Sequence, residues 1–233
     1  RFAEAMPPGE RALTIAEAAL GPEHFFVGRV IDNLAELHRA QGRFQETESL
    51  LKRAIIVKEK SLGSQHPDVA APMNGLAVLY LSQGRFNEAE PLFKRALTIM
   101  ERSLGPNHPD VASALSNLAN AYQAKQRYPE AEQLFRRSVA IDQKVYGSNH
   151  PNVALTVGML ATLYRSQHRL ADAEPLYKHS LAVLEQSLGP NHPHVTTAVN
   201  NLAFLYVDMN RNADALPLVQ RLIAAGKANP ILA

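Results

Sequence analysis

The chain has 233 residues, of which 46% are hydrophobic, so it is long enough to bury a substantial core. Cysteine is absent, which excludes a disulfide framework and a thiolate metal site. The 24 Lys and Arg against 22 Asp and Glu leave a net charge of +2, which is too little to indicate nucleic-acid binding. No apolar run approaches the roughly 20 residues of a membrane span.

A period of 42 residues runs through the whole sequence. It is visible at Gly21, Gly63, Gly105, Gly147 and Gly189, at His24, His66, His108, His150 and His192, and at Arg1, Arg43, Arg85, Arg127, Arg169 and Arg211. A fixed period between 20 and 50 residues is typical of solenoids, in which each unit packs only on its neighbours. The sequence therefore predicts a stack of similar units, and it argues against an enzyme.

The first 20 residues match the second half of a repeat. Residues 1–5 align in phase with residues 85–89, so the sequence begins within a repeat and we expect it to be a fragment. We predict a helix here that corresponds to the second helix of a truncated repeat. We also expect Met6-Pro7-Pro8-Gly9 to disrupt that helix, because proline lacks the N–H donor that a helix interior uses.

Residues 66 to 105 show what one unit contains. Pro67 fits a first helical turn, and an apolar stripe at helical spacing follows at Val69, Met73, Leu76, Ala77 and Tyr80. Residues 83–85 interrupt the pattern, and a second stripe occupies Phe86, Ala89, Leu92, Phe93, Ala96 and Met100. We expect the second helix to end at Gly105 in a left-handed conformation, with Pro106 preventing its continuation. Each unit is thus predicted to be two antiparallel helices.

The same pattern divides the rest of the chain into helix pairs. We expect them at residues 24–62, 67–104, 109–146, 151–188 and 193–226, after the helix at 1–20 and before a frayed tail at 227–233. This organisation gives about 11 helices in a single all-α solenoid over residues 1–226.

The residues within each unit carry a family resemblance. Leu76-Ala77, Tyr80, Gly84, Phe86, Ala89, Phe93 and Ala96 resemble the tetratricopeptide signature of Leu, small residue, Tyr, Gly, aromatic, Ala, aromatic and Ala. A unit of 42 residues, compared with the usual 34 or so, is similar to the tetratricopeptide domain of kinesin light chains and their bacterial relatives. The resemblance covers nearly the whole chain. It implies a right-handed superhelix of antiparallel helix pairs that binds extended peptides in its concave groove; kinesin light chains capture segments with a tryptophan flanked by acidic residues.

Positions that face this groove supply the candidate binding residues. An amide donates and accepts hydrogen bonds at once and so suits a peptide backbone. We single out Asn74, Asn117, Asn120, Gln123, Arg165, Asn200 and Asn201. A hydrogen bond within the solenoid fits each asparagine equally well, so both roles stay open. Asn74 and Val78 stand where tetratricopeptide domains that grip a C-terminal carboxylate carry Lys and Asn, which argues against that ligand.

Two polar ladders have simpler explanations than a metal site or a nucleic-acid surface. Successive histidines belong to successive repeats, on the order of 10 Å apart, whereas zinc holds its ligands at about 2 Å. We expect them to bond free backbone groups where the first helices begin. Acidic and basic residues stand four apart on what we expect to be a solvated helix face, at Glu48–Lys52, Glu90–Lys94, Glu132–Arg136 and Glu174–Lys178. We therefore predict no metal, no cofactor, and neither nucleic acid nor membrane as a partner.

These features predict a non-catalytic scaffold for a protein or peptide partner. No Gly-rich phosphate loop, nucleophile elbow or zinc-protease motif is present in the sequence. Two alternatives stay open: a regulatory or sensor module of a larger multidomain signalling enzyme, and self-association through the ends of the solenoid. A cysteine-free chain without a membrane span fits the cytoplasm.

Overall fold

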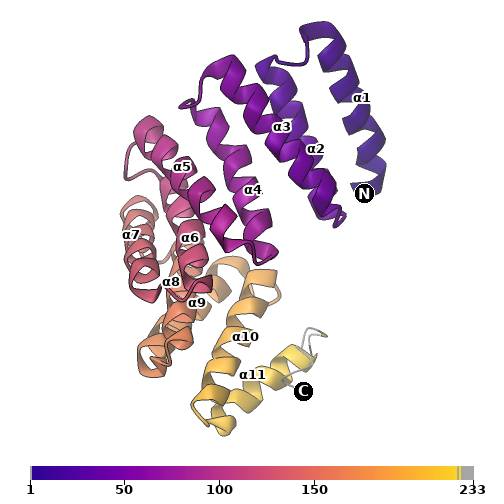
Figure 1. Cartoon of the computed structure of the whole chain (residues 1–233). Coiled ribbons are helices and arrows are strands. Elements are labelled where there is room, and N and C mark those ends of the chain that lie inside the picture. Colours follow the sequence, from indigo (N-terminus) through magenta and orange to yellow (C-terminus); the bar gives the residue numbers. More distant parts are fainter. Residues whose placement is uncertain (1, 225, 227–233) are drawn as a thin grey trace. The chain divides into compact units, whose positions relative to one another are not determined.

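The computed structural model describes residues 2–224 and 226, and within that range the chain forms helices and no strands (Figure 1). The α-helices are α1 Phe2–Leu20, α2 Phe25–Ala40, α3 Phe44–Leu62, α4 Ala70–Ser82, α5 Phe86–Leu104, α6 Pro109–Ala124, α7 Tyr128–Tyr146, α8 Pro151–Ser166, α9 Leu170–Leu188, α10 Pro193–Asp208 and α11 Asn212–Ala224. A 3₁₀ turn, η1 Pro67–Val69, leads into α4. The predicted all-α class is confirmed, while the predicted tail at 227–233 lies outside the described residues.

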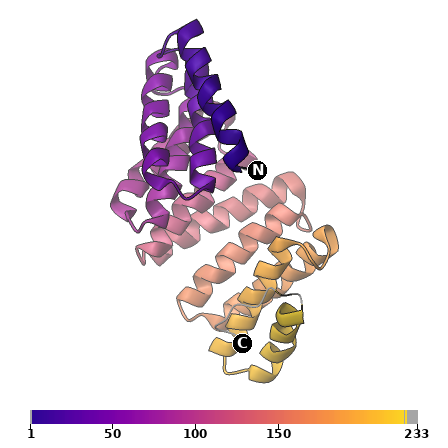
Figure 2. The same ribbon diagram turned by 90° about the vertical axis from the view of Figure 1, so that its right-hand side faces the viewer.

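The chain forms two compact units, Arg1–Ala121 and Tyr122–Ala233, which divide within α6. In the first unit α1 packs on α2, α2 on α3, α3 on α4 and α4 on α5. In the second unit α7 packs on α8, α8 on α9, α9 on α10 and α10 on α11. Paired helices such as α2 and α3 run in opposite directions (Figures 1 and 2), so the predicted antiparallel helix pairs are confirmed.

Small residues alternate with aromatic residues in the packed core. Ala77 in the first unit and Ala161 in the second have no exposed surface, and Phe93 and Tyr177 are also buried. Alanine lets two helices approach closely, while an aromatic ring fills the space that remains. This complementarity explains why both residue types recur at the repeat interval.

The histidine ladder marks the starts of the first helices. Nδ1 of His66 accepts a hydrogen bond from the backbone N–H of Asp68 at 3.2 Å, and His24, His108, His150 and His192 each make the same bond two residues onward. The backbone of His66 is extended, with φ −71° and ψ 139°. That conformation is typical of an N-cap, and a following proline such as Pro67 also favours it. The predicted bond from these histidines to free backbone groups is confirmed.

The glycines that end the second helices differ in detail from the prediction. Gly105 has φ 87° and ψ 154°, and Gly63 has φ 91° and ψ 151°. The positive φ agrees with the expectation, but ψ lies far from the left-handed helical value of about 47°. The chain leaves the helix in an extended direction because it must reach the next cap, where the His108 N–H donates to the Gly105 carbonyl at 3.3 Å. This backbone region is essentially restricted to glycine.

The turn inside each helix pair is a Schellman motif. The Gly84 N–H donates to the Leu81 carbonyl at 3.1 Å, and the Arg85 N–H donates to the Tyr80 carbonyl at 2.9 Å. These two bonds define that C-cap. Gly84 has φ 73°, whereas the same position in later repeats holds Gln126, His168 and Asn210, each with φ 57°. A left-handed residue with a Cβ costs roughly 1–2 kcal/mol, so the later turns carry strain that the earlier ones avoid.

We expect His168→Gly to stabilise the protein, because glycine adopts a positive φ without this strain. The net gain should be about 0.5–1 kcal/mol once the greater unfolded-state entropy of glycine is subtracted, or roughly 1–4 °C in Tm. Thermal unfolding followed by circular dichroism measures the change. Gly84→Ala is the matched substitution in the opposite direction and should lower Tm. A His168→Gly protein that melts below the parent would contradict the expectation.

Two prolines lie inside α1, and the predicted disruption of this helix is wrong. The helix continues from Phe2 to Leu20 through Pro7 and Pro8. Pro7 is the sixth residue of α1, just as Pro91, Pro175 and Pro217 are the sixth residues of α5, α9 and α11. A proline at this position removes a hydrogen bond only to the second residue of the helix, so the loss is confined to the helix start. Packing of α1 on α2 maintains the helix beyond it.

A cluster of charged and aromatic side chains connects neighbouring repeats. Glu48 of α3 accepts hydrogen bonds from Lys52 at 2.7 Å, from the Tyr80 hydroxyl at 2.9 Å and from Arg85 at 2.6 Å. The Arg85 guanidinium also lies over the Tyr80 ring, 3.9 Å from its centre. The same cluster recurs in the second unit as Glu132, Arg136, Tyr164 and Arg169, and again as Glu174, Lys178, Tyr206 and Arg211.

These clusters correct the expectation of a solvated charge row. The i, i+4 pairs are present, but the side chains of Glu48, Glu132 and Glu174 are only 20%, 16% and 17% exposed. Each glutamate is covered by the tyrosine and arginine of the following repeat. The pKa of Glu48 is about 2, below its ordinary 4.5, chiefly because Arg85 and Lys52 donate hydrogen bonds to the carboxylate.

The low pKa of Glu48 predicts a pH-dependent contribution to stability. A carboxyl whose folded pKa is depressed stabilises the protein above its unfolded pKa and loses this contribution as the pH falls through its folded pKa. We expect Glu48→Gln to lower Tm by about 2–4 °C at pH 7, and the difference from the parent to shrink between pH 4.5 and pH 2. Calorimetric melts across this range test it. A Tm difference that is constant with pH would show that the Glu48 charge contributes nothing.

Candidate functional site

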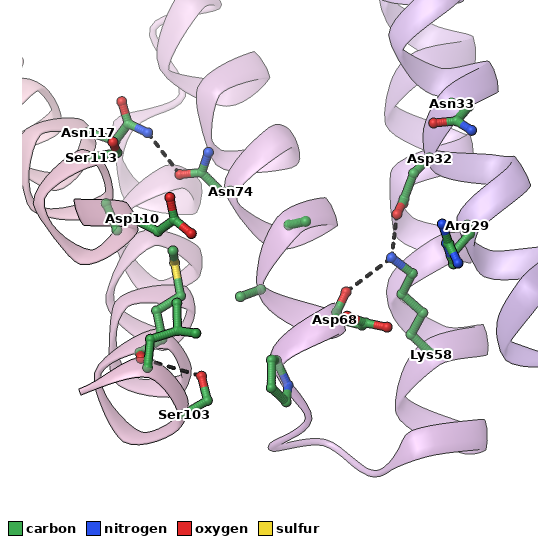
Figure 3. A pocket seen from close by; sticks show the side chains of 16 residues that line it. Arg29, Asp32, Asn33, Lys58, Asp68, Asn74, Ser103, Asp110, Ser113 and Asn117 are labelled. Carbon is green, nitrogen blue, oxygen red and sulfur yellow. Dashed lines mark hydrogen bonds and ion pairs between the residues drawn. The ribbon is translucent and has the colours of Figure 1, made fainter. Parts of the chain in front are cut away.

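The first unit contains a pocket of about 670 Å³ (Figure 3). Its lining comes from α2, α3, η1, α4, α5 and the start of α6. Charged and amide side chains are prominent there, namely Arg29, Asp32, Asn33, Lys58, Asp68, Asn74, Asp110 and Asn117. The volume falls within the range of about 300–1,000 Å³ that is usual for ligand sites.

Two of the predicted binding residues meet in this pocket. Asn117 Nδ2 donates a hydrogen bond to Asn74 Oδ1 at 3.0 Å, which joins α6 to α4 (Figure 3). An amide side chain has two N–H donors and one carbonyl acceptor. The Asn74 amino group and the Asn117 carbonyl therefore remain available to a ligand, since they have no partner within the described residues. The pair links successive repeats and also presents hydrogen-bonding groups to the pocket.

A buried lysine reaches the same pocket from α3. The Lys58 side chain is 4% exposed; its ammonium pairs with the Asp32 carboxylate of α2 and donates to the backbone carbonyl of Asp68 at 3.0 Å. Gly28 leaves room for it, because a Cβ there would lie 2.8 Å from Lys58 Cγ. Within the described part of the chain, Asp32 Oδ1 is buried and accepts no hydrogen bond. Burial raises the pKa of Asp32 even though Lys58 acts in the opposite direction.

The combination of Gly28, Asp32 and Lys58 is not found at the equivalent positions of the later repeats. Later repeats hold Ala70, Ala112 and Ala154 at the position of Gly28, and Met100, Asp142 and Leu184 at the position of Lys58. A buried ion pair is often no more stabilising than apolar side chains of similar size, so the helix stack itself does not require this pair. Lys58 was missed from the sequence because it lies on a second helix. The signal that points to it is Gly28, which stands where the next three repeats hold alanine.

A second pocket of about 330 Å³ adjoins the first and shares Asp32, Ala71 and Asn74 with it. Apolar groups dominate its walls, which include Ala35, Leu51, Pro72, Gly75 and Val78. We refer to the two pockets together as the α2–α4 groove. Glu36 and Arg39 also line the second pocket, so the groove is charged and amide-rich at one end and combines apolar walls with an ion pair at the other.

Two predicted binding residues of the second unit make contacts within the fold. Gln123 donates to the Ser166 hydroxyl at 2.9 Å. Arg165 pairs with Asp208 at 2.5 Å, and its guanidinium lies 5.2 Å from the centre of the Phe204 ring. Both side chains thus connect one first helix to the next.

The other predicted asparagines are not part of the amide pair. Asn120 of α6 and Asn201 of α10 are half-buried. Asn200 has a buried Oδ1 with no hydrogen-bond partner among the described residues. Their role as ligand contacts stays a prediction.

Metal and membrane sites are not found in residues 2–224 and 226. This part of the chain has no group of three or more His, Cys, Asp or Glu side chains that could hold a metal ion. It also has no helix that combines the length and apolar character needed to cross a bilayer.

The 42-residue period and the stacked helix pairs define a helical repeat protein. A family model described as Tetratricopeptide repeat matches residues 27–102, 68–144, 110–186 and 157–228, and a second model with the same description matches residues 1–25. The chain belongs to the tetratricopeptide repeat family, and the resemblance seen in the sequence is confirmed. Repeats of this family generally mediate interactions between proteins.

Solved structures share the fold. Nearly identical TPR-like repeats from a Podosopora anserina kinesin light chain protein give a TM-score of 0.70 at 28% identity, over 85% of this chain and 94% of that one. BtubC (BKLC) from P. vanneervenii gives 0.76 at 23% identity, over 97% and 89%. A tetratricopeptide repeat protein from Parabacteroides merdae gives 0.66 at 18% identity, over 98% and 74%. None of the curated proteins is significantly similar in sequence.

The buried ion pair predicts a strongly non-additive pair of substitutions. Asp32→Asn with Lys58→Met copies Asn74 and Met100 of the next repeat, and this double variant should melt within about 3 °C of the parent. Asp32→Asn alone leaves the buried Lys58 ammonium without its carboxylate and should cost about 3 kcal/mol or more. Thermal melts of the parent, both single variants and the double variant measure the coupling. A double variant that melts as low as Asp32→Asn would contradict it.

Proposed function

We propose that this chain is a non-catalytic scaffold that binds an extended segment of a partner protein along the α2–α4 groove. The observation that carries the proposal is the Asn74–Asn117 amide pair in the wall of the larger pocket, with donors and an acceptor left over. An extended peptide presents N–H and C=O groups of its own. The unused amide groups can pair with these groups without selecting a particular sequence.

The shape of the α2–α4 groove supports an extended ligand. Successive side chains of an extended segment point to opposite faces, and each residue advances the chain by about 3.3 Å. Two adjoining hollows that share Asp32, Ala71 and Asn74 can therefore accept two side chains from one segment. Membership of a family whose repeats mediate protein–protein interactions favours such a segment over a small molecule.

Peptide selection tests this proposal directly. Nonapeptides selected from a random display library on the immobilised chain are synthesised, and their Kd values are measured by calorimetry. We expect Asn74→Ala with Asn117→Ala to weaken binding roughly tenfold or more, because two hydrogen bonds of about 1 kcal/mol each are removed.

The matched control is Asn152→Ala with Asn212→Ala, which removes two exposed amides near helix starts in the second unit. It should leave Kd within about twofold of the parent. Circular dichroism spectra and melts confirm that each variant is folded. Equal affinity of the Asn74/Asn117 variant and the parent, or a loss seen only with Asn200→Ala and Asn201→Ala, would refute binding in the α2–α4 groove.

A further inference from the structure

His38 of α2 stands where every later repeat has a tyrosine. The corresponding residues, at intervals of 42, are Tyr80, Tyr122, Tyr164 and Tyr206. All four tyrosines are buried, and the hydroxyl of Tyr80 donates to Glu48 at 2.9 Å. One repeat earlier, the sequence has Met6 at the position of Glu48. The phenol and the carboxylate of the recurring cluster are therefore both replaced here.

The His38 imidazole is buried and incompletely hydrogen-bonded. The residue is only 5% exposed, and its Nδ1 atom is buried with no hydrogen-bond partner within the described residues. A neutral imidazole has one donor and one acceptor nitrogen, whereas a protonated imidazole has two donors. Protonation would therefore place a positive charge in the interior and leave an N–H at Nδ1 with no acceptor among those residues. Both changes cost free energy in a buried position.

The charged groups around His38 do not replace the missing carboxylate. Arg43, the N-cap residue of α3, adds a like charge. Glu46 of α3 already accepts a hydrogen bond from Arg43 at 3.0 Å and is 46% exposed, and Glu10 of α1 is also exposed. Water and salt screen exposed charges more strongly than buried ones such as Glu48. Burial, together with Arg43, lowers the pKa of His38 from its ordinary 6.5, against the opposing effect of Glu46 and Glu10.

His38 lies on the face of α2 that packs against α1. Leu34 precedes it by one helical turn, so the two side chains share a face of the helix. A Cβ on Gly9 of α1 would lie 3.2 Å from Cδ1 of Leu34 and 3.4 Å from Cδ1 of Leu37. The two helices are therefore in close contact beside His38 (Figure 1), and a charge on the imidazole would weaken their packing.

We propose that His38 makes the packing of α1 on α2 sensitive to pH, so that protonation of its imidazole between roughly pH 7 and pH 5 loosens α1 while the second unit stays folded. This device does not depend on peptide binding, although α2 also lines the α2–α4 groove. A histidine whose folded pKa is depressed binds fewer protons in the folded state than in the unfolded state. The stability of this packing therefore falls as the pH drops below the ordinary value of 6.5.

Hydrogen exchange of the full chain tests the proposal. Exchange is measured by mass spectrometry at about pH 7.5 and about pH 5.5, with exchange times scaled to the intrinsic rate at each pH. We expect the protection of residues 2–40 to fall by about fivefold or more at the lower pH, because the buried imidazole becomes charged. The protection of α10, in the second unit, should change by less than about twofold.

Two substitutions remove the titrating group. His38→Gln keeps a polar side chain that carries no charge, and His38→Tyr copies the residue of the later repeats. In both variants the protection of residues 2–40 should be the same at the two pH values. The matched control is His194→Gln, which removes an exposed histidine from α10 and should leave the response of residues 2–40 as it is in the parent.

A direct titration keeps the proposal testable even if both variants are destabilised. The imidazole resonances of the parent are followed with pH by two-dimensional NMR, and His38 is assigned through its own backbone resonances. We expect its midpoint to lie below 6.5. A midpoint at or above this value, protection of residues 2–40 that does not change with pH, or a change that persists in both His38 variants would overturn the proposal.

Discussion

The arginine that follows each Schellman turn sets the geometry on which the rest of this structure depends. The Arg85 backbone N–H closes the turn on the Tyr80 carbonyl, and its guanidinium lies over the ring of the same tyrosine while it pairs with Glu48 of the preceding repeat. Charge-assisted hydrogen bonds and cation–π contacts are both directional. One side chain therefore links the angle between the two helices of a pair to the packing of that pair on the preceding repeat. This packing sets how neighbouring first helices are placed.

The helix pairs could be predicted because a characteristic residue stands at each helix boundary. A histidine before a proline, as at His66, indicates the side-chain bond that caps a first helix. A glycine at the inter-helix turn, as at Gly84, indicates the backbone bonds of the Schellman motif. The continuity of α1 through Pro7 could not be predicted from local propensity, since it depends on the place of the proline within the helix. Similarly, ψ of Gly105 depends on the direction of the next helix start, which no single residue encodes.

Burial of the charged residues was harder to predict than the fold. Glu48 was expected to be solvated, yet it is covered by residues 32 and 37 positions further along the chain. Asn74 and Asn117 were predicted as binding residues and meet in one pocket, whereas Gln123 and Arg165 turned out to bond Ser166 and Asp208. Periodicity identifies which face a side chain occupies, but the partner that reaches it depends on the packing of the next repeat.

The grouping of Gly28, Asp32 and Lys58 in one repeat has a consequence for how a long ligand would align. A strictly periodic surface would offer the same contacts in every repeat. An extended peptide could then bind in several positions, each shifted by one repeat, with equal free energy. The Asp32–Lys58 ion pair, which does not recur at the equivalent described positions of later repeats, removes this degeneracy, because only one alignment places a complementary group beside it. These residues thus fix the register in which a long ligand would lie along the repeats.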